Sequence, residues 1–134
     1  MRTTARETAF KIIFASQFTE SVEDGFKRAL YSNEKLNNND IEYCEKILKT
    51  VNENSEQFAD MLDKRSRLFP ESRLFPADRS IFLLALAEIF YFEDIPDAVS
   101  VNEAANIASK YSSEKSASFI SGILSEIIRE KENV

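Results

Sequence analysis

Residues 77–92 constrain the fold of this chain more than any other segment. Apolar side chains point to every side of a helix drawn through them, and Glu88 is the one acid in the apolar run 81–92. A helix that is apolar on all sides has to be surrounded by other elements. The run is also too short to cross a bilayer, which needs roughly 20 residues. The sequence therefore predicts a buried helix in the middle of a bundle.

The rest of the chain also repeats its apolar residues at helical spacing, and no segment alternates as a strand would. With two glycines and three prolines, the chain has little of the turn chemistry that separates strands. Its 134 residues, 43% of them hydrophobic, fit one compact domain. We expect an all-α fold with helices over residues 4–18, 22–31, 40–64, 77–92, 101–111 and 114–131.

Polar residues at the expected helix starts support these boundaries. Thr4 with Glu7, and Ser100 with Glu103, have the spacing of a capping box. Asn39 is a suitable cap for the third helix. Within the last helix a glycine at position 122 costs roughly 1 kcal/mol relative to alanine, a cost that a close helix–helix contact could offset.

The composition argues against enzymatic chemistry. The chain has no histidine, which is the usual general base near neutral pH. Its single cysteine, Cys44, lies on an apolar stripe, so we interpret it as a structural thiol. One cysteine allows neither an intramolecular disulfide nor a Cys/His metal site. We predict no catalytic residue, no metal and no cofactor, and a cytoplasmic location without a signal peptide or membrane span.

The charge pattern leaves room for a polyanion. The formal net charge of −6 opposes non-specific binding to phosphate. Residues 1–19, 64–79 and 110–119 are nevertheless basic segments. A polyanion could bind if the fold brings two of these segments together.

Glu88 allows two interpretations, because an unpaired buried carboxylate would be costly. It is either a partly exposed acid paired with an arginine or a contact to a partner protein. Among the aromatic residues, Phe10, Phe14 and Phe119 could stack on bases, although core packing is the commoner role for any one phenylalanine. Phe119 is the best candidate, since it follows Lys115 and several serines.

Several motifs resemble the NusB family of transcription antitermination factors. Residues 101–105 and 107–111 are similar to the family motif I-N-E-A-V-E-L-A-K-K-F, and residues 119–124 are similar to F-V-N-G-V-L. Residues 5–14 resemble the family's R-E-x-A…L-Y start. The resemblance covers nearly the whole chain and is weak over residues 20–70.

The resemblance implies a fold of two packed helical bundles with about six to seven helices. These would be an N-terminal subdomain over about 1–70 and a C-terminal bundle over about 71–134, within a single domain 1–134. It further implies binding to the boxA element of ribosomal RNA leaders together with NusE, a small-subunit ribosomal protein. The complex would then join the RNA polymerase elongation complex with other Nus factors. Self-association as a homodimer stays open.

By position, the resemblance assigns RNA binding to the start of the first helix and the start of the last. The residues are Arg2, Arg6, Lys110, Lys115, Ser116 and Phe119. Glu88 lies where a family glutamate meets the protein partner. The chain departs from the family pattern at Thr3, Thr4, Leu83, Ala87, Ser118 and Ser121. Some of these changes remove charge or a polar group, which predicts weak RNA binding without the partner.

Two other functions fit the same fold. A module that binds only protein is favoured by the acidic net charge, whereas the two basic helix starts favour RNA binding. NusB-like domains also occur as accessory domains of RNA methyltransferases, for which we expect this chain to have no room.

Overall fold

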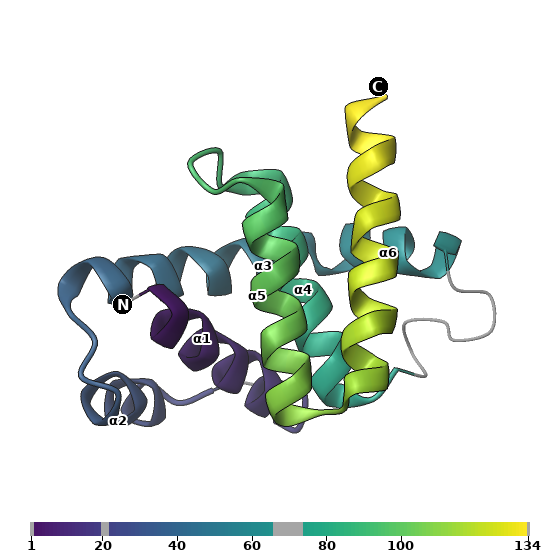
Figure 1. The fold of residues 1–134 in the computed structure, drawn as a ribbon. Helices are drawn as coiled ribbons and strands as arrows, with labels where there is room; N and C mark the ends of the chain where they lie inside the picture. The colour runs from purple at the N-terminus through teal and green to yellow at the C-terminus, as the bar shows by residue number, and fades with distance from the viewer. Residues whose placement is uncertain (1, 20–21, 66–73, 134) are drawn as a thin grey trace.

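The computed structural model describes residues 2–19, 22–65 and 74–133, and these contain six helices and no strand (Figure 1). The helices are α1 (Arg2–Ser16), α2 (Asp24–Asn33), α3 (Asn38–Arg65), α4 (Pro76–Tyr91), α5 (Asp97–Tyr111) and α6 (Glu114–Glu132). The predicted all-α class is confirmed. The expected boundary between two subdomains near residue 70 lies outside the described residues.

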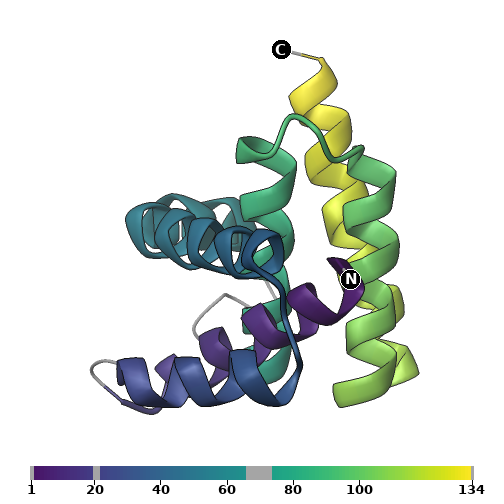
Figure 2. The ribbon, with the colours of Figure 1, turned by 90° about the vertical axis from the view of Figure 1, so that its left-hand side faces the viewer.

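Helix α4 is the centre of the molecule, as its all-round apolar sequence predicts. Every residue from 80 to 89 is buried. The helix packs against α1, α3, α5 and α6 (Figures 1 and 2). Burying one large apolar side chain stabilises a fold by about 1.5–3 kcal/mol, so this helix supplies much of the driving force for folding. In the described part of the chain, no helix has the length and apolarity needed to cross a membrane.

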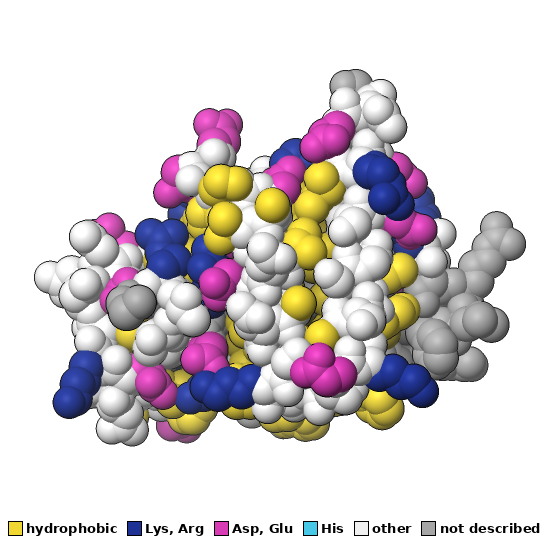
Figure 3. Space-filling model, viewed as in Figure 1, with side chains coloured by type: hydrophobic (Ala, Val, Ile, Leu, Met, Phe, Trp, Pro, Cys, Tyr) yellow, Lys and Arg dark blue, Asp and Glu magenta, His cyan; other side chains and the backbone are white. Residues whose placement is uncertain are grey.

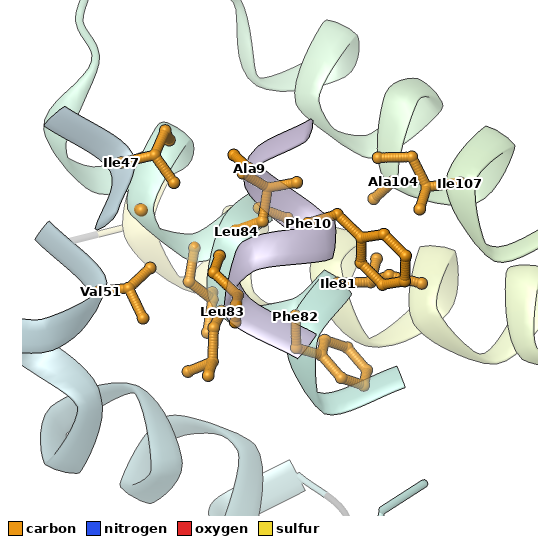
Figure 4. Packing of buried hydrophobic residues seen from close by; sticks show 14 of the residues in the cluster. Ala9, Phe10, Ile47, Val51, Ile81, Phe82, Leu83, Leu84, Ala104 and Ile107 are labelled. Atoms are coloured by element: carbon orange, nitrogen blue, oxygen red, sulfur yellow. The ribbon is translucent and has the colours of Figure 1, made fainter. Parts of the chain in front are cut away.

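Both halves of the chain contribute to one continuous core. Figure 4 shows side chains of α1 and α3 meeting those of α4, with α5 on the other side. The labelled residues are Ala9, Phe10, Ile47, Val51, Ile81, Phe82, Leu83, Leu84, Ala104 and Ile107. Helix α1 is therefore held between α3 and the C-terminal helices, and its position depends on both.

Neither predicted capping box forms. Helix α1 begins before Thr4, whose carbonyl accepts a hydrogen bond from the Thr8 hydroxyl at 2.8 Å. Helix α5 begins at Asp97, after Pro96 in the N-cap position, so Ser100 lies inside the helix. A proline followed by an acid is itself a good helix start, and it frees the Ser100 hydroxyl for another partner.

The polar loop before α3 and the serines before α6 do provide caps. The Asn37 side chain, two residues before the expected cap at Asn39, accepts a hydrogen bond from the Asp40 amide at 2.9 Å. The Ser113 hydroxyl accepts from the Ser116 amide at 3.0 Å, which starts α6.

The glycine at position 122 does not mark a close helix–helix contact. It is exposed on α6, and a Cβ built there would meet no atom within 4 Å. No close helix–helix contact offsets the cost of this glycine, since the space beside it is open.

Candidate nucleic-acid interface

The start of α1 lies against α5, and its two arginines point to different environments. Arg2 is exposed, and its guanidinium carbon lies 4.4 Å from the centroid of the Tyr43 ring. Such a cation–π contact orients the side chain while its outer face stays in water. Arg6, one turn further along, is only 4% exposed. The two residues that the family resemblance assigns to one RNA surface therefore differ in access to any ligand.

Arg6 is engaged inside the protein. Its Nε donates to Glu88 Oε2 at 2.6 Å, and its Nη1 lies 3.8 Å from Glu103 Oε2. Burial by itself lowers the pKa of Arg6, but the hydrogen bond and charge of Glu88 outweigh it, so the pKa lies above its ordinary value. The guanidinium stays charged and faces carboxylates, and a direct contact with an RNA phosphate does not fit this geometry.

Glu88 is also in the interior, with 1% of its surface exposed. Its Oε2 accepts hydrogen bonds from Arg6 and from the Tyr43 hydroxyl, and its Oε1 accepts from Ser100 Oγ at 2.7 Å. Burial and the neighbouring Glu88 charge raise the pKa of the Tyr43 hydroxyl, which keeps it a donor. Pairing with an arginine is thus confirmed, but with full burial. A direct contact between this carboxylate and a partner protein does not fit the structure.

The C-terminal end of α5 brings a second basic stretch beside α1. Lys110 is exposed, and its Nζ donates to Oε1 of Glu7 on α1 at 2.7 Å. This hydrogen bond, followed by the charge of Glu7, raises the pKa of Lys110. The fold therefore joins two of the three basic segments, 1–19 and 110–119. Much of the third, 64–79, lies outside the described residues.

The start of α6 continues this surface. Lys115 is exposed in the first turn. The Ser116 hydroxyl donates to Oδ2 of Asp78 on α4 at 2.9 Å, which ties the two helix starts together. The first amides of a helix carry partial positive charge, so this end of α6 is a favourable place for an anion. Any contribution of Ser116 to anion binding would come from its position at the helix start, because its hydroxyl already donates to Asp78.

Phe119 lies one turn further along α6 and is partly buried. Its ring meets the buried ring of Phe82 edge to face, with centroids 5.8 Å apart. Part of Phe119 thus belongs to the core. The remaining exposed part lies on the same helix start as Lys115.

A row of aromatic rings connects α1 with α5. The centroid of Phe10 is 5.1 Å from that of Tyr111 and 6.2 Å from that of Phe14, and Phe14 is 5.2 Å from Phe18. Phe14, Phe18 and Tyr111 are 37%, 64% and 37% exposed. Figure 3 shows hydrophobic, basic and acidic side chains together along the lower edge, where α1 and α5 end and α6 begins. Sequence reasoning missed Phe18 and Tyr111, although the spacing 10, 14, 18 is a signal for one helix face.

Among the described residues, neither a cluster of metal ligands nor the Cys44 thiol offers another site. They hold no group of three or more His, Cys, Asp or Glu side chains that could bind a metal ion. Burial, with the charges of Asp40 and Glu45, raises the pKa of the Cys44 thiol to about 12. A thiol with that pKa is protonated at neutral pH and is not a nucleophile. Fold and surface together define an all-helical domain with a face that combines exposed aromatic rings, lysines and acidic side chains.

Comparisons with known proteins narrow this class. The model of the NusB family matches residues 3–129. The transcription antitermination protein NusB of Natranaerobius thermophilus is 36% identical over 129 residues, covering 94% of this chain and 93% of that protein. The protein of the same name from Acetivibrio thermocellus is 36% identical over 131 residues, covering 97% and 90%. The chain belongs to the NusB family.

Solved structures agree on the fold. T. maritima NusB superposes with a TM-score of 0.85 at 26% identity, covering 97% of this chain and 92% of that one. The NusB chain of a complex of antitermination factors NusB and NusE with dsRNA gives 0.85 at 22% identity, covering 96% of each chain. At that identity the second match supports the fold alone. The family resemblance drawn from the motifs is confirmed.

Proposed function

We propose that this chain is a non-enzymatic transcription antitermination factor of the cytoplasm, which binds boxA-type ribosomal RNA leader sequences together with NusE. In this role it joins the RNA polymerase elongation complex with other Nus factors. Family membership supports the role in transcription, and a solved complex of related factors contains NusB, NusE and RNA. The observation that carries the RNA proposal is that the end of α5, with Lys110, lies beside α1 and leads directly into the basic start of α6, with exposed aromatic rings between α1 and α5.

The proposed RNA surface has a cationic part and an aromatic part. Arg2, Lys110 and Lys115 would neutralise phosphates, and the first amides of α6 would add to the attraction. Phe119 and the exposed rings of Phe14 and Tyr111, which both contact Phe10, would stack on unpaired bases. Ser116 would shape the surface through its bond to Asp78. Arg6 and Glu88 are not proposed as contacts, because both are buried.

The acidic composition sets the expected strength of binding. A net charge of −6 repels RNA at long range, and Lys110 already pairs with Glu7. Direct affinity of the isolated chain should therefore be weak. NusE would add the missing contacts in a joint complex, which is the reason to test both proteins together.

A protein-only role is the second candidate, and specific observations favour it. Lys11 pairs with Glu34 at 2.9 Å as Lys110 pairs with Glu7, so two cations near the proposed surface face carboxylates of the same molecule. In that case the chain would bind NusE and leave all RNA contacts to its partner.

The experiment measures the affinity of a fluorescently labelled boxA RNA for the full chain, with and without NusE, over a salt series. We expect tighter binding with NusE and a linear fall of log K with log salt. Lys115→Ala should reduce the steepness of that line by about 0.7, as for one lost contact to single-stranded nucleic acid. The control Lys49→Ala removes an exposed lysine on α3 and should leave the line unchanged. If the chain adds nothing to RNA binding by NusE, the protein-only role replaces the proposal.

A further inference from the structure

Four helices meet at one buried carboxylate. Glu88 of α4 accepts hydrogen bonds from Arg6 of α1, Tyr43 of α3 and Ser100 of α5. All four side chains belong to residues that are 4% exposed or less. A carboxylate accepts about four hydrogen bonds, and three donors occupy this one. The cluster is therefore a finished internal contact with little capacity for an outside ligand.

The direct polar contacts between α1 and α5 are weaker than this cluster. Arg6 Nη1 lies 3.8 Å from Glu103 Oε2. Thr3 Oγ1 lies 3.5 Å from Glu103 Oε1 at the surface, and the pair of Glu7 and Lys110 is exposed. Exposed pairs contribute little to stability, while a buried pair that loses one member becomes strongly unfavourable. Glu88 of α4 bonds to Arg6 of α1 and to Ser100 of α5, so the position of α1 against these two helices depends on the buried cluster more than on the exposed pairs.

We propose that Arg6 and Glu88 are a positioning pair, which holds α1 against α4, beside α5, and so keeps Arg2 at the start of α1 in the RNA surface. Neither side chain touches RNA or NusE, and substitutions of either act on binding through the position of α1. This inference rests on the proposed function for its RNA readout only, because the position of α1 can be measured without RNA.

The first test compares salt dependence in three variants of the full chain bound with NusE. Arg6→Met strands the Glu88 carboxylate, displaces α1 and should weaken RNA binding roughly tenfold, in proportion to the lost docked fraction. The double variant Arg6→Met with Glu88→Gln leaves no buried charge unpaired and should recover affinity to within about threefold. Both should keep the steepness of the salt line, whereas Arg2→Met should reduce it by about 0.7.

Recovery in the double variant is the decisive outcome. If Arg6 itself contacted a phosphate, the double variant would stay as weak as Arg6→Met, and its salt line would flatten by about 0.7. That result overturns the positioning role.

The second test needs no RNA, because the chain carries its own probe. Cys44, the single cysteine, is fully buried, and its thiol donates to the carbonyl of Ala5 on α1 at 3.2 Å. Alkylation of Cys44 by iodoacetamide therefore reports how often α1 lifts. The rate should rise in Arg6→Met and return to within about threefold of the parent rate in the double variant.

The control for the labelling test is Leu62→Ala, a core change near the far end of α3, at a residue 2% exposed. The denaturant concentration is adjusted so that this control and Arg6→Met have equal global stability. Faster labelling of Arg6→Met than of the control supports local release of α1, and equal rates overturn it. Should the parent chain not bind boxA RNA, the proposed function fails while the labelling result still decides the positioning role.

Discussion

The start of α1 and the start of α6 carry the same kind of sequence, yet the structure uses them differently. Both have basic residues near a helix N-terminus that the family resemblance assigns to RNA. In α1, Arg6 turns inward to a carboxylate on the central helix. In α6, Lys115 stays exposed, and the neighbouring Ser113 caps the helix. A basic residue at a helix start can therefore hold the fold or face a ligand, and the helix face decides which.

The difference follows from what lies beneath each helix. Residues 5, 6, 8 and 9 of α1 are all buried, because α1 is covered by α3, α4 and α5. The first turn of α6 has its neighbours on one side only, and residues 113–115 are exposed. The buried helix requires a partner for every charge, whereas the exposed helix leaves its charge available.

The largest effect is expected from a change in the buried Arg6–Glu88 pair at the start of α1. Glu88→Lys places a cation beside Arg6 in the interior and should cost about 3–5 kcal/mol of unfolding free energy. Urea denaturation followed by circular dichroism measures this loss. The matched control Glu126→Lys changes an exposed acid on α6, and its effect should stay within about 0.5 kcal/mol. A Glu88→Lys protein as stable as the parent would contradict the buried pair.

Phe119→Ala tests the proposed role of the exposed start of α6 in RNA binding. Loss of one base-stacking ring should weaken boxA binding by about 1–3 kcal/mol, measured by fluorescence anisotropy with NusE present. Phe90→Ala is the control variant. Phe90 is also partly buried, but it lies near the C-terminal end of α4, whereas Phe119 packs on Phe82 in the first half of that helix. Equal RNA affinity of the two variants would remove Phe119 from the surface.

The cap of α6 is the next effect in size. Ser113→Ala deletes the hydroxyl that accepts from the Ser116 amide and should lower stability by about 1 kcal/mol. Ser112→Ala removes only an exposed hydroxyl that donates to Ser116 Oγ, so a change within about 0.5 kcal/mol is expected. Thermal denaturation of the two variants compares them directly. If they are indistinguishable, the cap does not stabilise α6.

The smallest effect concerns the open side of α6. Replacing the glycine at 122 by alanine should raise stability by about 0.4–1 kcal/mol, since the new methyl meets no atom within 4 Å and the unfolded chain loses freedom. A higher melting temperature is the expected observation. A lower one would mean that a neighbour packs on this position in solution.

The sequence predicts the fold well where apolar periodicity decides it. The all-apolar segment 77–92 becomes α4 over Pro76–Tyr91, and the expected last helix, 114–131, becomes α6 over Glu114–Glu132. Burial of many side chains fixes such elements, so local errors matter little. The same reasoning places the start of α5 too late, because Ser100 looks like a cap while Pro96 and Asp97 start the helix.

The roles of single polar residues are harder to predict. The partners of Glu88 lie 82, 45 and 12 positions away along the chain. No spacing rule links residues so far apart, and Tyr43 carries no sequence signal that marks it as a donor. The resemblance assigns Arg6 and Glu88 to outside ligands, whereas the packing of α1 on α4 pairs them with each other.

The most direct test of the account is an NMR titration of the ¹⁵N-labelled full chain with boxA RNA in the presence of unlabelled NusE. The amides of residues 2–4 and 110–119 should both shift, because both segments belong to the proposed RNA surface. The Arg6 Nε–H signal should stay unchanged and protected from solvent exchange, as befits its bond to Glu88. A shift of the Arg6 Nε–H signal on RNA addition, with residues 113–119 unperturbed, would contradict an internal role for Arg6 and RNA contact by the start of α6.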